Sequence, residues 1–368
     1  MTGPMNTLHL VYPHGPRIST PDAIGRHLAE RLAPDFRVRH HNWDSCRPIY
    51  PEPGDCLVGH AHPYPWTCFR LSLRQPGWRR RILLQPYVHG DNRQAAYLDS
   101  VIPQCDWFLS ITGRHWFTRV DESPFAHWRP KMIHVDLAVD RREFPPVKTA
   151  FSPPGHRRLV YVGHTAAYKN TPYLSQIAAE LPECQFSWIG SGRKTIHGVR
   201  AAGALDFATE GARNLLGHHD FMITVGRADA NPTTILEAMA WGLIPICTPE
   251  SGYEGYPDII NIPLDAPAEA ARIIRHWQAA PDADLHAMQR RNWELLDRHF
   301  TWARLGAQVR SCLQDDTPPP AVFPAPFFRH LNLRWLAVTA PGSPLRLREL
   351  ARWRFRQLHQ SCTEKTAP

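Results

Sequence analysis

Two acidic side chains, Asp229 and Glu237, lie eight residues apart in the segment ADANPTTILEAMAWGLIPICTPESGYEG, residues 228–255. Asn231 can cap a helix that begins between them. A free helix N-terminus offers unpaired N–H groups and about half a positive charge, which suits a phosphate group or sugar hydroxyls. An ordinary capped helix with a solvated Asp229 is the alternative. The candidate ligand contacts at the start of this helix are Asn231, Pro232 and Thr233.

Two further loops carry glycines and cations where strands are expected to end. In YVGHTAAYKN, residues 161–170, the strand ends in Gly163 and Lys169 lies at the start of the next helix. In IGSGRK, the strand ends in Gly190 and Arg193 follows. Glycine lets a backbone pass close to a ligand, and the two cations can face a diphosphate. The alternative for Lys169 and Arg193 is an ordinary surface position.

Histidines follow two expected strands in the N-terminal half. DCLVGHAH ends a strand with His60 and His62, and QPYVHGD ends the next strand region with His89. Ligands bind at the carboxyl ends of parallel strands, and a neutral imidazole donates one hydrogen bond while accepting another. These residues are therefore candidates for substrate contacts. A satisfied structural histidine is the alternative for each of them.

The elements that must position these residues alternate regularly along the chain. Short apolar runs predict strands, and apolar residues repeating every three or four positions predict helices between them. Such alternation is typical of βαβ units and a mostly parallel sheet. The expected strands are 8–12, 36–40, 56–58, 82–84, 107–111, 132–135, 159–162, 186–189, 221–225 and 244–247. One expected helix begins at Thr20. The others cover 171–181, 231–241, 267–277, 284–298 and 301–313.

The composition allows ordinary globular domains and an anionic partner. The 368 residues are 43% hydrophobic and carry a net charge of +8, which favours nucleotide diphosphates, phospholipid surfaces or nucleic acid, or serves solubility alone. The eight cysteines lack zinc-site spacing, so we expect reduced thiols in a cytoplasmic protein. The N-terminus lacks signal-peptide features, and no apolar run approaches the ~18 residues of a membrane span.

The segment 228–255 resembles the retaining GT-B glycosyltransferases of the large group-1, family-4 class. Their signature is two acids eight apart, then Ala-Met-Ala, a glycine and a buried strand, which here are Asp229, Glu237, residues 238–240, Gly242 and residues 244–247. The turn at Val139-Asp140 and Phe144-Pro145 before the linker also fits that family. The resemblance spans roughly residues 8–312.

This resemblance implies roles for the candidate residues. Asp229 and the loop after it would hold the donor sugar, Glu237 the nucleotide ribose, and Lys169 the diphosphate. His89 would face the sugar near the reacting carbon, while Gly15 and His62 would lie on the acceptor side. Two departures stand out: Asp229 replaces the usual Glu, and His164 replaces the usual Arg of the diphosphate loop. The remaining candidates for donor contacts are Gly163, His164, Gly190 and Arg193.

The sequence thus predicts two Rossmann-like α/β domains facing a cleft, with a Pro-rich and basic C-terminal tail. The expected domains are 1–148 (acceptor side), 149–313 (donor side) and the tail 314–368. The expected activity is metal-independent, retaining transfer of a hexose from a nucleotide-diphosphate sugar to a glycan, lipid-linked or small-molecule acceptor. No cofactor and no nucleic-acid partner is expected.

Several alternatives stay open at this point. One is a nucleotide-sugar epimerase of the same fold, and another is a noncatalytic sugar- or nucleotide-binding relative. A nicotinamide dehydrogenase is disfavoured because no Gly-x-Gly-x-x-Gly opens either domain. Five arginines alternate with apolar residues in 343–360, so this tail either contacts an anionic membrane at its inner face or remains a solvated or packed segment.

Overall fold

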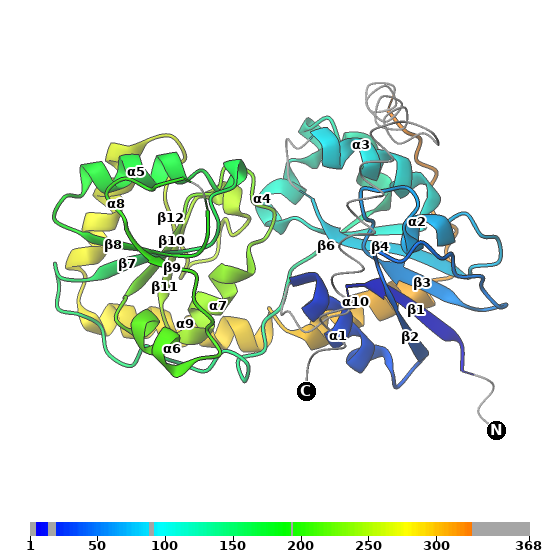
Figure 1. Cartoon of the computed structure of the whole chain (residues 1–368), viewed down its shortest axis with the longest axis horizontal. Coiled ribbons are helices and arrows are strands. Elements are labelled where there is room, and N and C mark those ends of the chain that lie inside the picture. The colour runs from blue at the N-terminus through cyan, green and yellow to red at the C-terminus, as the bar shows by residue number, and fades with distance from the viewer. Residues whose placement is uncertain (1–4, 14–19, 88–91, 193, 326–368) are drawn as a thin grey trace, which may run out of the picture.

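The computed structural model describes residues 5–13, 20–87, 92–192 and 194–325 of the chain. Two lobes lie side by side, each built around one sheet (Figure 1). Each sheet has six strands, and all their pairings are parallel. The predicted α/β architecture with two Rossmann-like domains is therefore confirmed.

The first sheet has the strand order β2-β1-β3-β4-β5-β6. Its strands are β1 (Thr7–Tyr12), β2 (Arg37–Asn42), β3 (Cys56–Gly59), β4 (Arg80–Pro86), β5 (Trp107–Ile111) and β6 (Met132–Val135). Every residue of β1 and β3 is buried, because helices cover both faces of a parallel sheet. The edge strand β2 instead has no buried residue.

The second sheet has the order β12-β11-β10-β7-β8-β9. Its strands are β7 (Arg158–Val162), β8 (Gln185–Ile189), β9 (Arg200–Gly203), β10 (Phe221–Thr224), β11 (Ile244–Cys247) and β12 (Ile260–Asn261). If β7 is counted as the first strand of this lobe, the order is 6-5-4-1-2-3, as in the dinucleotide-binding folds. In these folds the strand order reverses between the first and fourth strands. Here these two strands are β7 and β10.

Helices connect the strands and cover the sheets. They are α1 (Thr20–Leu32), α2 (Cys68–Ser72), α3 (Asn92–Val101), α4 (Gly113–Thr118), α5 (Thr171–Glu180), α6 (Glu210–Gly217), α7 (Thr233–Trp241), α8 (Pro267–Ala279), α9 (Asp282–Arg298) and α10 (Trp302–Gln314). The predicted helices and strands are all present with bounds shifted by two residues at most. Six further elements, β9, β12, α2, α3, α4 and α6, were not predicted from the sequence.

The last helix, α10, returns to the first lobe. It packs against α1 and β4, although the sequence placed residues 301–313 in the donor-side domain. Gly306 makes this packing close, since a Cβ there would lie 2.9 Å from the Cβ of Arg31 on α1. The backbone N–H of Val139 also donates to the carbonyl of Phe300, 3.1 Å away. The chain therefore crosses between the lobes twice.

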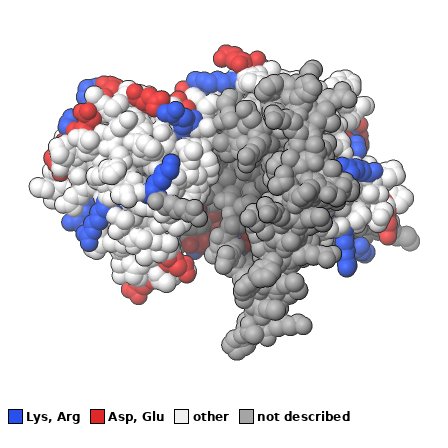
Figure 2. Space-filling view, turned by 45° about the horizontal axis from the view of Figure 1, so that its top comes forward, with Lys and Arg blue, Asp and Glu red and all other residues white. Residues whose placement is uncertain are grey.

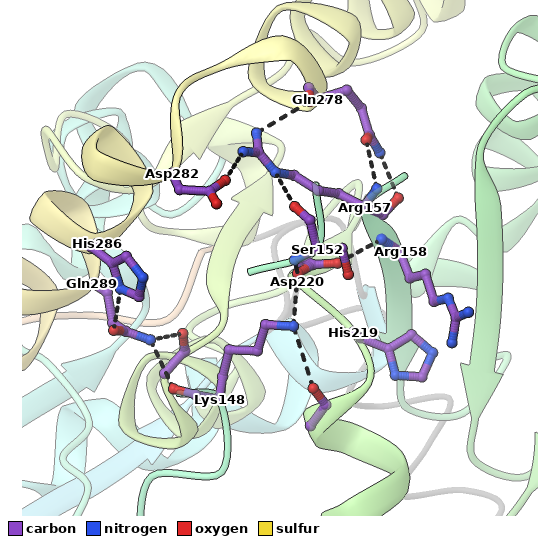
Figure 3. A network of polar contacts seen from close by, with 12 residues as sticks. Lys148, Ser152, Arg157, Arg158, His219, Asp220, Gln278, Asp282, His286 and Gln289 are labelled. Atoms are coloured by element: carbon purple, nitrogen blue, oxygen red, sulfur yellow. Dashed lines mark hydrogen bonds and ion pairs between the residues drawn. The ribbon is translucent and has the colours of Figure 1, made fainter. Parts of the chain in front are cut away.

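A buried ion pair anchors the linker to the second sheet. Lys148 Nζ lies 2.7 Å from Asp220 Oδ1, and both side chains are almost inaccessible to solvent. The same carboxylate accepts the backbone N–H groups of Ser152 and Arg158, both at 2.8 Å. Figure 3 shows this pair between the linker and the first residues of β7 and β10. Asp220 thus holds three donors at once.

Charge is mixed on the surface that Figure 2 presents. Basic and acidic side chains lie near one another over its described part, with uncharged areas between them. On this face the net charge of +8 is therefore not gathered into one basic patch. Among the described residues, no helix combines the length and apolar character needed to cross a bilayer. The arginine-containing tail 343–360 lies outside the described residues, so its membrane contact stays a prediction.

Removal of the Asp220 carboxylate is expected to destabilise the protein strongly. Asp220→Ala leaves Lys148 buried without its counter-ion, which costs about 3–5 kcal/mol of unfolding free energy. Glu269→Ala is the matched control, because it breaks an exposed pair with Arg272 worth no more than about 1 kcal/mol. Denaturant unfolding of the full chain measures both losses. Equal losses would contradict the structural role of the buried pair.

Candidate functional site

The candidate site lies where the second sheet reverses its strand order. β7 and β10 are neighbours, with Phe221 beside Leu159 in the parallel register. Their chains leave in opposite directions beyond the carboxyl ends, which opens the crevice where ligands bind in such sheets. The loop after β7 leads to Lys169 and α5, and the loop after β10 leads to Asp229 and α7.

Lys169 and Asp229 meet across this point. The Lys169 ammonium forms a close hydrogen-bonded ion pair with Asp229 Oδ2, and both residues are buried. The two loops are also joined by their backbones, since the N–H of Arg227 donates to the carbonyl of Tyr168 at 2.9 Å. The structure thereby brings together two of the three residues predicted to be catalytic. Their catalytic roles stay predictions.

Glu237 lies one turn into α7 and is half-buried. Burial raises the pKa of its carboxyl group to about 7, although a hydrogen bond from Thr233 and the charge of Lys169 both act to lower it. The group is therefore partly protonated at neutral pH and can either donate or accept a hydrogen bond. A carboxyl group with a shifted pKa next to a buried ion pair is a common feature of functional sites.

The start of α7 differs from the expectation. The helix begins at Thr233 rather than Asn231, Pro232 occupies the cap position, and no side chain caps it. Asn231 does not act as the cap because its Oδ1 accepts the N–H of Leu137 at 3.1 Å and the hydroxyl of Tyr253 at 3.3 Å. The N–H groups of the first turn therefore lack a side-chain acceptor and remain suited to an anion.

Asn231 instead joins the second lobe to the end of the first. Leu137 lies just beyond β6, so the amide oxygen of Asn231 bridges the lobes. Its Nδ2 is buried with no partner within the described part of the chain. A buried amide N–H₂ without an acceptor is energetically unfavourable, and a ligand oxygen would satisfy it.

Two glycines allow the loops after β7 and β8 to touch. A Cβ on Gly190, which has φ +157°, would lie 2.0 Å from the carbonyl oxygen of Gly163. The same carbonyl accepts the indole N–H of Trp188 at 2.8 Å. Any larger residue at position 190 would therefore push the two loops apart. The predicted approach of Gly163 and Gly190 to a ligand stays a prediction.

His164 lies on this loop as a neutral ring. Burial, followed by the charge of Lys169, lowers the pKa of His164, so the imidazole is uncharged at neutral pH. Its Nδ1 accepts the N–H of Ala166 at 3.2 Å, and its Nε2 lies 3.1 Å from the hydroxyl of Tyr168. In this structure His164 thus adds no positive charge to the loop.

On the first lobe, His62 belongs to a cluster of rings beyond β2 and β3. Its ring packs edge-on against Trp43 with centroids 5.5 Å apart and lies 4.8 Å from the ring of Tyr64. Tyr64 in turn stacks on Trp66 at 5.0 Å. Burial, followed by the charge of Arg70, lowers the pKa of His62 to about 4, so it is neutral.

Of this cluster, only the histidines were predicted from the sequence. The signal was present, since His60, His62, Tyr64 and Trp66 occupy every second position of HAHPYPW. Because Nδ1 of His62 accepts the N–H of Tyr64, the neutral ring carries its proton on Nε2. His62 can therefore donate a hydrogen bond to a ligand beside aromatic surfaces.

Three predicted site residues cannot be placed. Gly15, His89 and Arg193 lie outside the described residues. The element that follows Gly15 does reach the site, because Thr20 Oγ1 at the start of α1 lies 3.4 Å from Thr233 Oγ1 at the start of α7. The first turns of these two helices, one from each lobe, therefore meet beside the candidate donor residues.

A second contact between the lobes involves α4. The N–H of Arg114 donates to the carbonyl of Gly252 at 3.1 Å, and the indole of Trp116 donates to the carbonyl of Glu250 at 2.9 Å. His115 lies 2.8 Å from the Glu254 carboxylate. Figure 1 shows α4 where the two lobes meet. The loop after β11 is thus fixed by the first lobe.

Known structures share this arrangement of two lobes. No family model and no curated protein matches the chain in sequence. Sucrose-phosphate synthase from Thermosynechococcus elongatus has a TM-score of 0.62 at 13% identity, over 83% of this chain and 98% of that chain. HepE from Anabaena, in complex with UDP and glucose, has a TM-score of 0.56 at 11% identity, over 84% and 99%.

TarM has a TM-score of 0.55 at 9% identity, over 71% of this chain and 55% of its own, so this chain spans about half the length of TarM. All three proteins are GT-B glycosyltransferases. This chain has the GT-B fold. The resemblance drawn from the segment 228–255 is thereby confirmed at the level of the fold. Lys169, Asp229 and Glu237 lie on the second GT-B domain, at the reversal of its sheet.

The raised pKa of Glu237 predicts a pH-dependent difference in stability. Between pH of about 5 and about 7, the unfolded chain ionises this carboxyl group while the folded GT-B domain retains the proton. The unfolding free energy of the wild type therefore falls with rising pH relative to that of Glu237→Gln. Denaturant unfolding at several pH values measures this difference. Glu180→Gln, at the exposed end of α5, is the control. Parallel curves of unfolding free energy against pH for wild type and Glu237→Gln would contradict the raised pKa of Glu237.

Proposed function

We propose that this chain transfers a hexose from a nucleotide-diphosphate sugar to a hydroxyl group of a glycan, lipid-linked or small-molecule acceptor. The observation that carries the proposal is the Lys169–Asp229 pair beside an uncapped helix N-terminus at the sheet reversal. A cation and free N–H groups suit a diphosphate, and a carboxylate suits sugar hydroxyls. HepE, which shares the fold, was solved with UDP and glucose, which supports a donor of this class.

The chemical step needs a group that stabilises the departing nucleoside diphosphate. Negative charge grows on this leaving group as the glycosidic bond breaks, and preorganised cations and N–H groups lower the barrier. In our proposal Lys169 and the first turn of α7 supply them. Asp229 then orients the sugar hydroxyls, and Glu237 binds the ribose. We propose retention at the anomeric carbon on the resemblance of residues 228–255 to retaining enzymes.

The ring cluster of the first lobe supports an acceptor with a sugar-like carbon face. The C–H groups of a pyranose ring pack well on aromatic surfaces, and Trp43, Tyr64 and Trp66 provide such surfaces. The Nε2–H of His62 is available for a hydroxyl or ring oxygen. Acceptor binding on this lobe and donor binding on the other would bring the reacting groups together between them.

We also propose that no metal ion takes part. Charge neutralisation would come from Lys169 and the helix N–H groups, which do the work of a bound cation. The test uses the full chain with UDP-, ADP-, GDP- and dTDP-linked hexoses, and measures release of the free nucleoside diphosphate with and without EDTA. We expect release from at least one donor, unchanged by EDTA.

Other outcomes of this assay would overturn parts of the proposal. Binding of a donor without any release of nucleoside diphosphate would indicate a binding protein. Isomerised nucleotide sugar as the product would indicate an epimerase. Loss of activity in EDTA with recovery in Mg²⁺ or Mn²⁺ would overturn the metal-free mechanism. Inversion of the anomeric configuration, read by NMR of the product, would overturn retention.

Opposite changes in nucleoside-diphosphate affinity are expected from two substitutions in the same loop. Lys169→Ala removes the proposed phosphate cation and should weaken binding by about ten-fold or more, as for a lost charged hydrogen bond. His164→Arg replaces a neutral ring by a permanent cation and should tighten binding. Calorimetry with the diphosphate measures both, and the corresponding nucleoside is the control, because neither change should alter its affinity. Equal effects on nucleoside and diphosphate would contradict the phosphate role.

Glu237→Ala is expected to weaken the binding of both the nucleoside and the nucleoside diphosphate. The proposed partner of this carboxyl group is the ribose, which the nucleoside and the diphosphate share. Calorimetry should therefore show a similar fold-loss for both ligands, unlike the selective loss for Lys169→Ala. Donor binding and turnover equal to those of the wild type would refute the ribose role of Glu237.

A further inference from the structure

A second cavity lies at the opposite end of the donor-side sheet. Its volume is about 560 Å³, and basic side chains from three elements line it. Arg158 is the first residue of β7, Arg200 is the first residue of β9, and His218 and His219 follow the end of α6. Since Gly163, Gly190 and Lys169 lie beyond the carboxyl ends of the strands, this cavity is separate from the proposed donor site.

The arginine charges in this cavity are not balanced by any described carboxylate. None of its lining residues, all within the described part of the chain, is an aspartate or glutamate. The guanidinium groups of Arg158 and Arg200 take part in no ion pair with the described residues. The adjacent Arg157 contrasts with them, because its buried guanidinium donates to four carbonyls and to Asp282. The two exposed arginines thus remain available to an external anion.

The carboxylate of Asp220, beside this cavity in sequence, is already occupied. Asp220 follows His219 in sequence, yet it pairs with Lys148 and accepts two backbone N–H groups. In Figure 3 the side chains of Arg158 and His219 lie on the same side, away from the Lys148–Asp220 pair. The end of α6 also adds little negative potential, because its last carbonyls accept hydrogen bonds from the backbone of His218 and His219 and from Lys148.

His219 adds a group that can share a proton with the ligand. It is buried, and its Nδ1 lies 3.1 Å from the carbonyl of Leu215, so Nδ1 carries a proton. Burial lowers the pKa of His219, which leaves the ring neutral at pH 7. Hydrogen bonds to the carbonyls of Leu216 and Leu215 oppose this shift, and the charge of Arg158 adds to it. An anion beside Arg158 would offset that charge and favour protonation of Nε2.

The remaining lining is suited to a carbon skeleton. Phe186, Leu215, Ala201 and Ala202 contribute apolar surface, and Ser187 adds a hydroxyl. Small-molecule pockets typically measure about 300–1,000 Å³, so the cavity exceeds the needs of an inorganic ion. The planar guanidinium group of arginine matches the oxygens of a phosphate. Two arginines and two histidines are more donors than a single carboxylate group on a ligand needs.

We propose that this cavity binds a phosphate monoester of a small organic molecule. Arg158 and Arg200 hold the phosphate, and the apolar surface of Phe186 and Leu215 holds the organic part. A sugar phosphate and a nucleoside monophosphate share this chemistry. The site does not depend on the proposed transferase activity, because it uses none of the donor-site residues.

The test is calorimetry on the full chain with four probes: glucose 6-phosphate, AMP, inorganic phosphate and glucose. We expect at least one monoester to bind more tightly than inorganic phosphate, and glucose not to bind. Arg158→Ala and Arg200→Ala should each weaken the monoester by about ten-fold, as expected for a lost charge-assisted hydrogen bond. Arg272→Ala, on the exposed face of α8, is the control and should leave affinity unchanged. The preferred monoester identifies the source of the phosphate.

A further variant separates this site from the donor site. Lys169→Ala should leave monoester binding unchanged, while it weakens nucleoside diphosphates if the proposed function is right. The proposal would be overturned if Lys169→Ala abolished monoester binding and Arg158→Ala left it intact. That result would place the ligand at the donor site. Failure of every monoester to bind would also overturn it, without affecting the proposed function.

Discussion

The structure of the candidate site depends on one buried ion pair, Lys169 with Asp229. Two charges removed from water are stable only when they lie in close contact, so this pair fixes the loops after β7 and β10 relative to each other. The close approach of the surrounding backbone agrees with this constraint. A Cβ on Gly226 would lie 2.9 Å from the Cβ of Asp229 and 3.1 Å from Ser251 Oγ.

The loops after β10 and β11 hold the first lobe in position. Asn231, two residues after Asp229, accepts the N–H of Leu137, and the loop after β11 accepts the N–H of Arg114. Gly113 and Gly252 make the second contact possible. Gly113 has φ +66°, and a Cβ on it would lie 2.5 Å from the Cα of Gly252. Bulkier residues at either position would separate α4 from the donor-side loop, and with it the two halves of the site.

The sequence predicted the core of both domains because their strands are short apolar runs with clear ends. It did not predict β9, since Arg200–Gly203 is an exposed edge strand with no large apolar side chain. It also assigned Asn231 to a helix cap, because nothing local reveals that Leu137, 94 positions away in the chain, binds its amide oxygen. Lys169 and Asp229 were each singled out by local spacing, but their contact depends on the strand order, which a single sequence does not contain.

The Lys169–Asp229 ion pair also affects how the proposed donor would be selected. In the structure Lys169 is already neutralised by Asp229, so a diphosphate that binds Lys169 weakens that pair. The buried Asp229 carboxylate then needs other donors, because an unsatisfied charged acceptor is costly. The hydroxyl groups of a linked sugar can supply them, whereas a bare nucleoside diphosphate cannot. Under the proposed function, the same ion pair that shapes the site therefore favours a nucleotide sugar over its diphosphate product, and it promotes product release after transfer by re-forming.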